Sequence, residues 1–255
     1  MVKKAKYFYF LLLLLSFSQI HGQKKIEFPA EWKVITTQQA REPNRYGGRI
    51  VFYGPEGKII DEKKVLEFMK TGRFTQDFYV DKEGKIVAMH VKGASEQQLK
   101  RLEESEANKK LLAASIGKPA RPFTVTDLNG EEISLADLKG SVVAINFWFV
   151  GCKPCILEMP ELNEIVEKHE GEDVKFVAVA LDKKPMIDKF LSNQSFDYDI
   201  VPEGREIAFL YNIKLYPTHC IIDKNGVIQY FKSGYSGNTA KEVDSKISDL
   251  LKKEP

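Results

Sequence analysis

The segment covering residues 142–160 constrains the fold of this chain more than any other. Its first part, residues 142–149, is an almost unbroken apolar and aromatic run, the pattern of a strand that is buried on both faces. Over residues 156–166, apolar side chains recur at the spacing of an amphipathic helix. Between the two lie Cys152 and Cys155, a Cys-x-x-Cys pair. The sequence therefore places two cysteines where a central strand ends and a helix begins.

The position of Cys152 at the start of the predicted helix favours a reactive thiolate. Unpaired backbone N–H groups and the helix dipole stabilise negative charge at a helix N-terminus, and the thiolate is the nucleophilic form of cysteine. We expect the Cys152 side chain to be exposed and to attack a substrate disulfide. Cys155, one turn further along, is expected to be shielded and to resolve the mixed disulfide. Lys153 either adds positive charge beside the thiolate or is simply solvated, and both interpretations stay open.

Five residues of this segment match the active site of the thioredoxin-fold thiol–disulfide oxidoreductases: Trp148, Cys152, Pro154, Cys155 and Pro160. The chain resembles that family, and Asn146 and Glu158 make it similar to the exported bacterial branch typified by TlpA and ResA. Ordinary thioredoxins have a buried Asp at the place of Asn146, whereas ResA-like proteins have a carboxylate at the place of Glu158. Gly151 departs from the family, which usually has Trp immediately before the first cysteine.

The rest of the C-terminal half alternates strands and helices and ends in a hairpin. The predicted elements are strands at residues 124–127, 174–181, 218–223 and 227–232, a helical turn at 134–139, and helices at 185–192, 205–212 and 239–252. This order predicts an α/β domain with a central mixed sheet and helices on both faces. The resemblance covers residues 117–253 and implies that residues 113–255 form a thioredoxin-like three-layer fold.

The predicted C-terminal hairpin begins at Thr218, directly after Tyr216 and Pro217. In the resembling family the proline at this place is cis and packs against the cysteine pair, which leaves neighbouring backbone groups free to pair with an extended substrate. Together with Trp148, these three are the predicted substrate-binding residues. The alternative is a trans proline that starts an edge strand.

Glu158 follows Cys155 by three residues on the same helix, so the two side chains are expected on one side of it. Resolution of a mixed disulfide requires Cys155 to lose its proton, and a partly buried carboxylate at position 158 is suited to accept it. The alternative is a solvated helical carboxylate, the usual environment of Glu. Cys220 is expected to be a buried free cysteine and His219 a solvated strand residue, neither with a catalytic role.

A Cys-x-x-Cys pair can also be half of a zinc site, which needs two further ligands at suitable spacing. The four histidines are scattered along the chain, and Cys220 has no cysteine neighbour. Redox chemistry is therefore favoured, and neither a metal nor a cofactor is expected.

The first 22 residues have the composition of a signal peptide. Three lysines precede an apolar run at residues 7–15, and small and polar residues lead up to residue 22. The run is too short to span a bilayer comfortably. We therefore expect cleavage, export to the periplasm or cell envelope, and no stable membrane span afterwards. The formal net charge is only +2, without the concentrated basic face that a nucleic-acid partner would require, so no such partner is expected.

Residues 23–112 lack the thioredoxin pattern and are predicted to form a small α+β domain of unknown role. The predicted elements are strands at residues 31–37 and 49–53, a helix at 61–70, a hairpin at 74–89 and a charged helix at 95–114. A capping box from Ser95 to Gln98 opens the last of these.

Three functions are compatible with the residues and the resemblance. The first is an exported thiol–disulfide oxidoreductase that reduces disulfides of envelope proteins through a mixed disulfide. For this function the resemblance implies protein thiol and disulfide substrates, apocytochrome thiols among them, and electrons from a membrane thiol reductase. The second is a binding or chaperone-like module in which the redox pair is secondary. The third, a peroxiredoxin-type thiol peroxidase, would have Pro and then Thr or Ser where this chain has Ile145 and Phe149.

Overall fold

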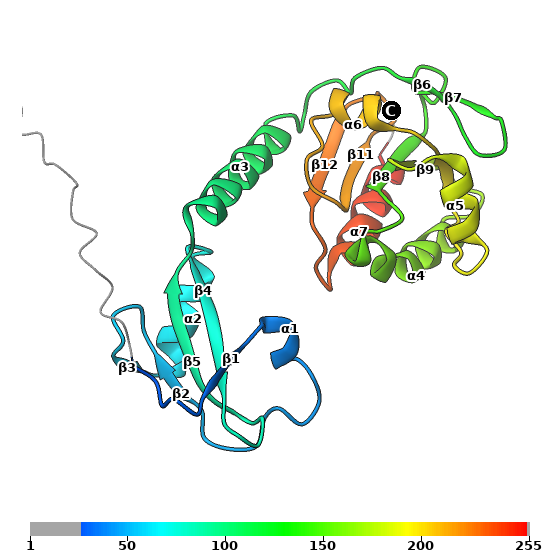
Figure 1. The fold of residues 1–255 in the computed structure, drawn as a ribbon. Helices are drawn as coiled ribbons and strands as arrows, with labels where there is room; N and C mark the ends of the chain where they lie inside the picture. The colour runs from blue at the N-terminus through cyan, green and yellow to red at the C-terminus, as the bar shows by residue number, and fades with distance from the viewer. Residues whose placement is uncertain (1–26, 254–255) are drawn as a thin grey trace, which may run out of the picture. The chain divides into compact units, whose positions relative to one another are not determined.

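The computed structural model describes residues 27–253 (Figure 1). The signal peptide predicted at residues 1–22 lies outside the described residues. The chain divides into two compact units, one ending at Leu102 and the other beginning at Glu103. None of the helices within residues 27–253 is long and apolar enough to cross a membrane.

The first unit is built on a five-stranded sheet with the order β1-β4-β5-β2-β3. Its strands are β1 (Lys33–Ile35), β2 (Val51–Tyr53), β3 (Ile59–Ile60), β4 (Phe74–Val80) and β5 (Ile86–Gly93). β4 and β5 form the predicted antiparallel hairpin, and β2 pairs with β5 in parallel. The predicted helix is α2 (Glu62–Lys70), with Asp61 as its N-cap, whereas the short α1 (Thr37–Ala40) is not predicted from the sequence.

Helix α3 (Glu96–Ala113) is the predicted charged helix, and its capping box is present. The Ser95 N–H donates to Gln98 Oε1 (2.8 Å), and the Gln98 N–H donates to Ser95 Oγ (3.3 Å). The division between the two units falls inside this helix. Its later turns belong to the second unit, where Asn108 Nδ2 donates to the carbonyl of Asn212 (2.8 Å).

The second unit contains a five-stranded mixed sheet with the order β10-β9-β8-β11-β12. Its strands are β8 (Val142–Trp148), β9 (Val174–Ala180), β10 (Asp199–Val201), β11 (Thr218–Ile222) and β12 (Ile228–Ser233). β8, β9 and β10 are parallel, and β11 runs antiparallel to both β8 and β12. Every residue of the central strand β8 is buried, as its apolar run predicts. The short strand β10 is not predicted from the sequence.

A separate strand pair, β6 (Thr124–Thr126) and β7 (Glu132–Ser134), precedes this sheet in the chain. The sequence predicts a helical turn from residue 134, but β7 extends to that residue and turns follow it. The reason is that Ile133 and Leu135 both pack into the core. A spacing of two residues between buried side chains suits an extended segment, not a helix.

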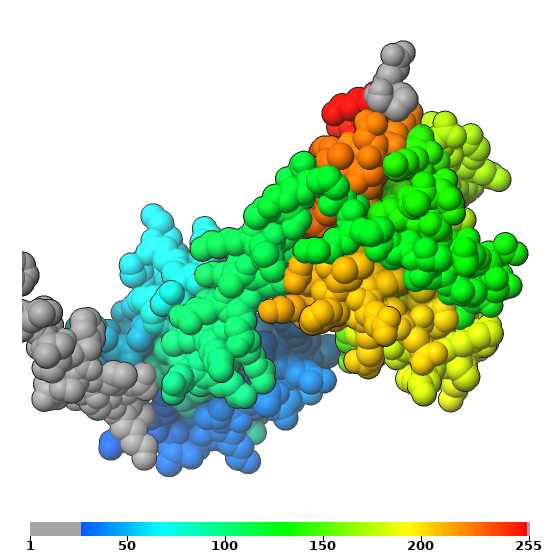
Figure 2. Space-filling model, turned by 90° about the horizontal axis from the view of Figure 1, so that it is seen from above, coloured from blue at the N-terminus to red at the C-terminus, as the bar shows by residue number. Residues whose placement is uncertain are grey.

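Four helices cover the two faces of the five-stranded sheet of the second unit (Figure 1): α4 (Lys153–Lys168), α5 (Lys184–Leu191), α6 (Arg205–Leu210) and α7 (Thr239–Leu251). Alternate residues of β8 point to opposite faces. Ala144 and Trp148 pack with residues of α4, α5 and α7, whereas Val143 and Phe147 pack with residues of α6. The predicted α/β three-layer fold is confirmed. The segment that carries α6, gold in Figure 2, lies at the surface of the second unit, and its Phe209 is 85% exposed.

Candidate active site

The two cysteines of the Cys-x-x-Cys pair are joined by a disulfide, with their Cα atoms 5.3 Å apart. Cys152 is the N-cap of α4, and its Sγ accepts a hydrogen bond from the N–H of Cys155 (3.3 Å). Pro154 occupies the first turn, where its fixed φ suits a helix and no N–H is needed. The Cys152 N–H donates to the carbonyl of Phe149 (3.0 Å), which closes the turn after β8. The strand, the turn and the proline thus fix the pair at the N-terminus of α4.

Both cysteine side chains are buried in this disulfide-bonded state. Cys155 is 1% exposed, in agreement with the expectation that it is shielded. Cys152 is 4% exposed, so the expectation of an exposed thiol is wrong for this state. The reason is that its sulfur is bonded to Cys155 and faces the first turn of α4. Lys153, between the two, is exposed.

The peptide bond between Tyr216 and Pro217 is cis, as the resemblance implies. The Pro217 carbonyl accepts the N–H of Gly234 (2.7 Å), which ties this loop to the end of β12. The Tyr216 ring lies edge-on to Phe149, with the ring centroids 5.5 Å apart. Because Phe149 directly follows β8, this contact holds the proline loop next to the end of the strand that leads to the cysteine pair.

Of the four residues predicted to bind substrate, Tyr216 alone is partly exposed. Pro217 and Thr218 are buried, so their side chains are not open to a partner. Trp148 is fully buried, and its ring packs against Phe196, with the centroids 5.7 Å apart. The Trp148 side chain is therefore a core residue and not a surface contact, because α4 and α5 cover its face of β8.

Three buried polar side chains from three elements meet in the second unit. They are Asn146 of β8, Glu158 of α4 and His219 of β11, here called the polar cluster, and they are 1%, 1% and 2% exposed. Asn146 Nδ2 donates to Glu158 Oε1 (3.1 Å), and His219 Nε2 lies 3.1 Å from the same oxygen. Asn146 Nδ2 also lies 3.3 Å from His219 Nδ1. The cluster begins one helical turn after Cys155, at the position of Glu158.

The polar cluster changes the interpretation of two residues. Glu158 is fully buried, so the alternative of a solvated carboxylate is wrong. His219 is also buried, contrary to expectation, because β11 has a strand on each side and α4 and α7 cover this face. The burial of His219 could have been predicted from its position two residues before the apolar Ile221, because residues two apart on a strand share a face.

Two tyrosines add to the electrostatics around Glu158. Burial raises the pKa of the Tyr198 phenol, and the Glu158 carboxylate raises it further. Burial likewise raises the pKa of Tyr230, with further contributions from Glu242 and Glu158. Both phenols are therefore neutral at physiological pH. Among residues 27–253, Glu158 Oε2 has no hydrogen-bond partner, so this oxygen is open to receive a proton.

The third cysteine, Cys220, is a buried free cysteine, as predicted. Burial raises the pKa of its thiol, which is therefore protonated at neutral pH. Cys220 packs with Phe147 and Ile222 on the face of the sheet opposite to α4. It is therefore separated from the cysteine pair by the sheet itself.

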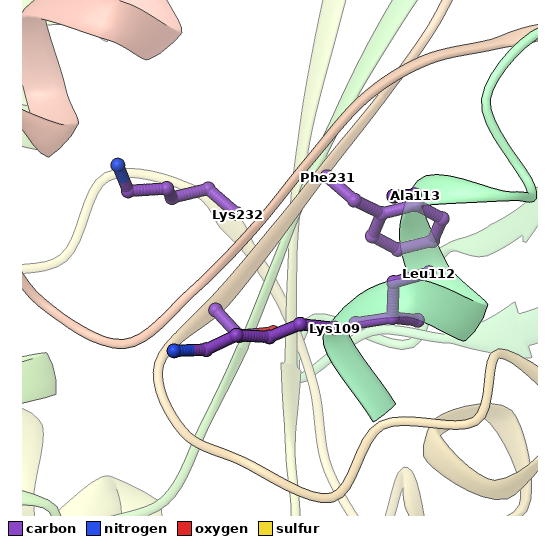
Figure 3. Close-up of a pocket in the computed structure, with 6 residues that line it drawn as sticks. Lys109, Leu112, Ala113, Phe231 and Lys232 are labelled. Atoms are coloured by element: carbon purple, nitrogen blue, oxygen red, sulfur yellow. The ribbon is translucent and has the colours of Figure 1, made fainter. Parts of the chain in front are cut away.

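A cavity of about 300 Å³ lies between the end of α3 and β12 (Figure 3). Figure 3 shows the Phe231 ring beside Leu112 and Ala113, while the side chains of Lys109 and Lys232 extend away from the ring. No cysteine and no residue of the polar cluster lines this cavity, so it is not the redox site.

The described part of the chain does not bring three or more His, Cys, Asp or Glu side chains together to hold a metal ion.

A Cys-x-x-Cys disulfide at a helix N-terminus on a thioredoxin-like fold defines a thiol–disulfide oxidoreductase. Sequence comparison with known proteins identifies the family within this class. The chain is 37% identical over 136 residues to thiol-disulfide oxidoreductase ResA of Bacillus thuringiensis subsp. konkukian, a match that spans 52% of this chain and 79% of ResA. It is 33% identical over 144 residues to thioredoxin-like protein YneN of Bacillus subtilis, spanning 55% and 83% of the two chains. The chain belongs to the ResA-like family of thiol–disulfide oxidoreductases.

Two further comparisons agree with this family. The family model described as AhpC/TSA matches residues 116–231, which lie in the second unit. A crystal structure from Chlorobium tepidum, described as a DsbE thiol:disulfide interchange protein, has 28% sequence identity and a TM-score of 0.50. That match covers 53% of this chain and 97% of the solved chain.

Proposed function

We propose that this thiol–disulfide oxidoreductase is exported and reduces disulfide bonds of cell-envelope proteins through a mixed disulfide with Cys152. The observation that supports this most strongly is the arrangement of the site on α4. A Cys152–Cys155 disulfide stands at the helix N-terminus, and the buried Glu158 follows one turn later. One helix thus carries a nucleophile, a resolving thiol and a proton acceptor.

The first step is attack by Cys152. In the disulfide-bonded structure Cys152 Sγ accepts the Cys155 N–H at the N-terminus of α4, and in the reduced protein this N–H and the helix dipole would stabilise the Cys152 thiolate. A bond forms between Cys152 Sγ and one substrate sulfur, and the substrate S–S bond breaks. The departing substrate thiolate takes a proton from solvent.

The second step is resolution by Cys155. Its thiol gives a proton to Glu158 and attacks Cys152 Sγ, which breaks the bond between Cys152 and the substrate. The second substrate thiolate leaves, and the enzyme is left with the Cys152–Cys155 disulfide. Two electrons have passed from the enzyme dithiol to the substrate. Glu158 suits the role of acceptor because it is buried, lies at i+3 from Cys155, and has its Oε2 atom open.

The substrate binds beside the proline loop in this proposal. Tyr216 and Phe149 are both partly exposed and lie in contact next to the cysteine pair. An extended peptide that pairs with the backbone of Tyr216 would bring its disulfide to Cys152. Because backbone pairing does not depend on side-chain identity, such a site would accept different proteins.

The reducing direction needs a source of electrons, because each turnover leaves the Cys152–Cys155 disulfide oxidised. We assign its reduction to a membrane thiol reductase, with export directed by the signal peptide predicted at residues 1–22. The cycle runs toward reduction when the cysteine pair has a lower reduction potential than the substrate disulfide.

The test is turnover of insulin disulfides with dithiothreitol as the electron source, for the wild type and for Cys152→Ser. We expect the variant to lose turnover, whereas Cys220→Ser, a substitution on the other face of the sheet, should keep it. Equal turnover by the wild type and Cys152→Ser would contradict the proposal. A chaperone-like function would instead appear as equal suppression of client aggregation by both chains, without insulin turnover by either.

A further inference from the structure

We propose that His219 is a positioning residue for resolution: it holds Glu158 as the proton acceptor and shares the proton that leaves Cys155. This inference rests on the proposed function, since it concerns the second step of the same reaction. His219 acts through Glu158 and does not touch the cysteine pair in the reaction described above.

The first argument is the orientation of the carboxylate. His219 Nε2 and Asn146 Nδ2 both lie 3.1 Å from Glu158 Oε1. Glu158 Oε2 has no such partner in the part of the chain that the structure describes. The sheet therefore fixes one oxygen and leaves the other open for a proton. A carboxylate this deeply buried also needs such partners, because an unpaired charge in the core is strongly destabilising.

The second argument is the balance of protons. To accept the proton that Cys155 gives up, the pair must consist of the Glu158 carboxylate and a neutral His219 imidazole before resolution. When Cys155 gives up its proton, the pair gains one proton, which Glu158 receives at Oε2 and the imidazole can share. The result is a pair with no net charge, buried where an unbalanced charge is costly. The proton leaves once the substrate has departed, and no oxidant or reductant takes part.

Imidazole is the side chain whose ordinary titration falls between about pH 5 and 8, so it can take up and return a proton near neutrality. The pair can accept the Cys155 proton while it is empty, and it cannot accept that proton once it already holds one. The rate of release from the mixed disulfide should therefore rise with pH and then level off.

The neighbouring groups whose pKa is shifted, Glu242, Tyr198 and Tyr230, keep their charge state near neutrality. On β12, Lys232 stands opposite His219, and its Nζ lies 3.1 Å from a carboxylate oxygen of Glu242 on α7. The hydrogen bond from Lys232 is the main reason that the pKa of Glu242 is lowered, so the Glu242 carboxyl stays ionised near neutrality. Tyr198 and Tyr230, whose pKa values are raised mainly by burial, stay neutral. The pH dependence of release is thus assigned to the Glu158–His219 pair and to Cys155.

The experiment measures attack and release separately by stopped-flow fluorescence across pH 5–9, with a fluorophore-labelled glutathione disulfide as the probe. Attack is followed in a Cys155→Ser background, where the mixed disulfide accumulates. Release is followed in chains that carry both cysteines. The variant is His219→Gln, whose amide can still donate a hydrogen bond to Glu158 but cannot take up a proton at these pH values.

The matched control is His169→Gln. His169 is also a buried histidine of the second unit, and it pairs with Asp244 (Nε2 to Oδ1, 2.9 Å) and Glu172, away from the polar cluster. Its loss should lower stability but leave the pH profile of release unchanged. The two histidine variants together separate a loss of stability from a loss of the proton site.

We expect His219→Gln to leave attack unchanged, to slow release by about tenfold at pH 7, and to flatten its rise with pH. The effect should be smaller than the roughly 100-fold loss that removal of a general base itself produces. A release profile of His219→Gln that superimposes on the wild type, with attack intact, would overturn the inference. If the wild type shows no attack at all, it is the proposed function that fails.

A second measurement covers the case in which His219→Gln does not fold. The ring nitrogens of His219 can be followed by NMR in the wild type, in both redox states, and in Glu158→Gln. We expect the pH dependence of these signals to differ between reduced and oxidised protein and to shift when Glu158 is replaced. Identical titration curves in all three samples would overturn the inference.

Discussion

Asn146 and His219 stand directly opposite each other on β8 and β11, and both contact the same carboxylate oxygen of Glu158. The acid side chain that follows the cysteine pair is therefore held by two strands of the sheet, although it is carried by α4. A change in either strand residue should alter the chemistry at Glu158 without displacing Cys152 from the helix N-terminus.

Replacement of Glu158 by Gln should preserve the fold and the first attack, because Gln has the same shape and Cys152 is unchanged. Release from the mixed disulfide should slow by roughly 100-fold, since the acceptor of the Cys155 proton is lost. Stopped-flow reduction of a model disulfide across pH 5–9 measures both steps. Glu161→Gln is the control, because Glu161 is an exposed carboxylate on the same helix. Superimposable profiles for Glu158→Gln and the wild type would mean that Glu158 has no part in resolution.

Replacement of Asn146 by Asp should make stability depend more steeply on pH. The new carboxyl would stand where an amide now donates to Glu158 Oε1 (3.1 Å). Two adjacent buried carboxylates resist ionising together, so the pKa of the introduced group is raised in the folded state. A raised folded pKa favours the folded state at low pH, and this contribution is lost as pH rises through that pKa. We expect about 1–3 kcal/mol more destabilisation at pH 8 than at pH 4.5.

Urea unfolding of the wild type, Asn146→Asp and Asn193→Asp at these two pH values tests this expectation. Asn193 is exposed, so its replacement by Asp should change stability little at either pH. A destabilisation of Asn146→Asp that is equal at both pH values would contradict the electrostatic explanation.

In the reduced protein, iodoacetamide at neutral pH should modify Cys152 and spare the other two cysteines. Cys155 is shielded within α4, and the buried Cys220 keeps its proton because its thiol pKa is raised. Mass spectrometry after a brief native reaction gives the extent of labelling at each position, and labelling in urea provides the reference for full access. Equal modification of all three thiols under native conditions would contradict this prediction.

The ion pair between α4 and α7 should contribute stability that disappears in acid. Partial burial raises the pKa of the Asp244 carboxyl, but hydrogen bonds from Lys168 and His169 outweigh it and leave the pKa lowered. A lowered folded pKa stabilises the protein above the unfolded value, near 3.9, and this contribution is lost as pH falls through the folded pKa.

Asp244→Asn should therefore cost up to about 1 kcal/mol at pH 7, a small value because solvent screens the pair. The difference from the wild type should shrink as pH falls below about 3.9 and through the lowered folded pKa of Asp244. Urea unfolding at several pH values measures it, with the exposed Asp249→Asn on the same helix as control. A difference that persists unchanged in acid would show that packing, and not charge, is the cause.

The strand β8 and the start of α4 could be predicted from sequence because the residues that determine them lie close together in the chain. The apolar run of β8, the cysteine pair and Pro154 follow one another within one short segment, and each constrains the backbone directly. Strand β10 could not be predicted, since three residues are too few to show a period.

The burial of His219 was harder to predict because it depends on distant parts of the chain. β12 and α7 must close around β11 before a polar residue there loses contact with solvent. The burial of Cys152 could not be predicted from sequence for another reason: its sulfur is bonded to Cys155 in the structure, and a sequence does not specify the redox state of a cysteine pair. The cis peptide bond at Pro217 was expected from the resemblance and not from any local pattern.

The measurement that tests the central claim most directly is trapping of the mixed disulfide. Cys155→Ser is reduced, mixed with a disulfide-containing protein and analysed by mass spectrometry after digestion, with Cys152→Ser as the parallel sample. The mechanism predicts a covalent adduct of the Cys155→Ser chain in which the substrate is attached to Cys152, and no adduct of Cys152→Ser. Attachment at Cys220, or an equal yield of adduct from both variants, would contradict the assignment of Cys152 as the attacking thiol.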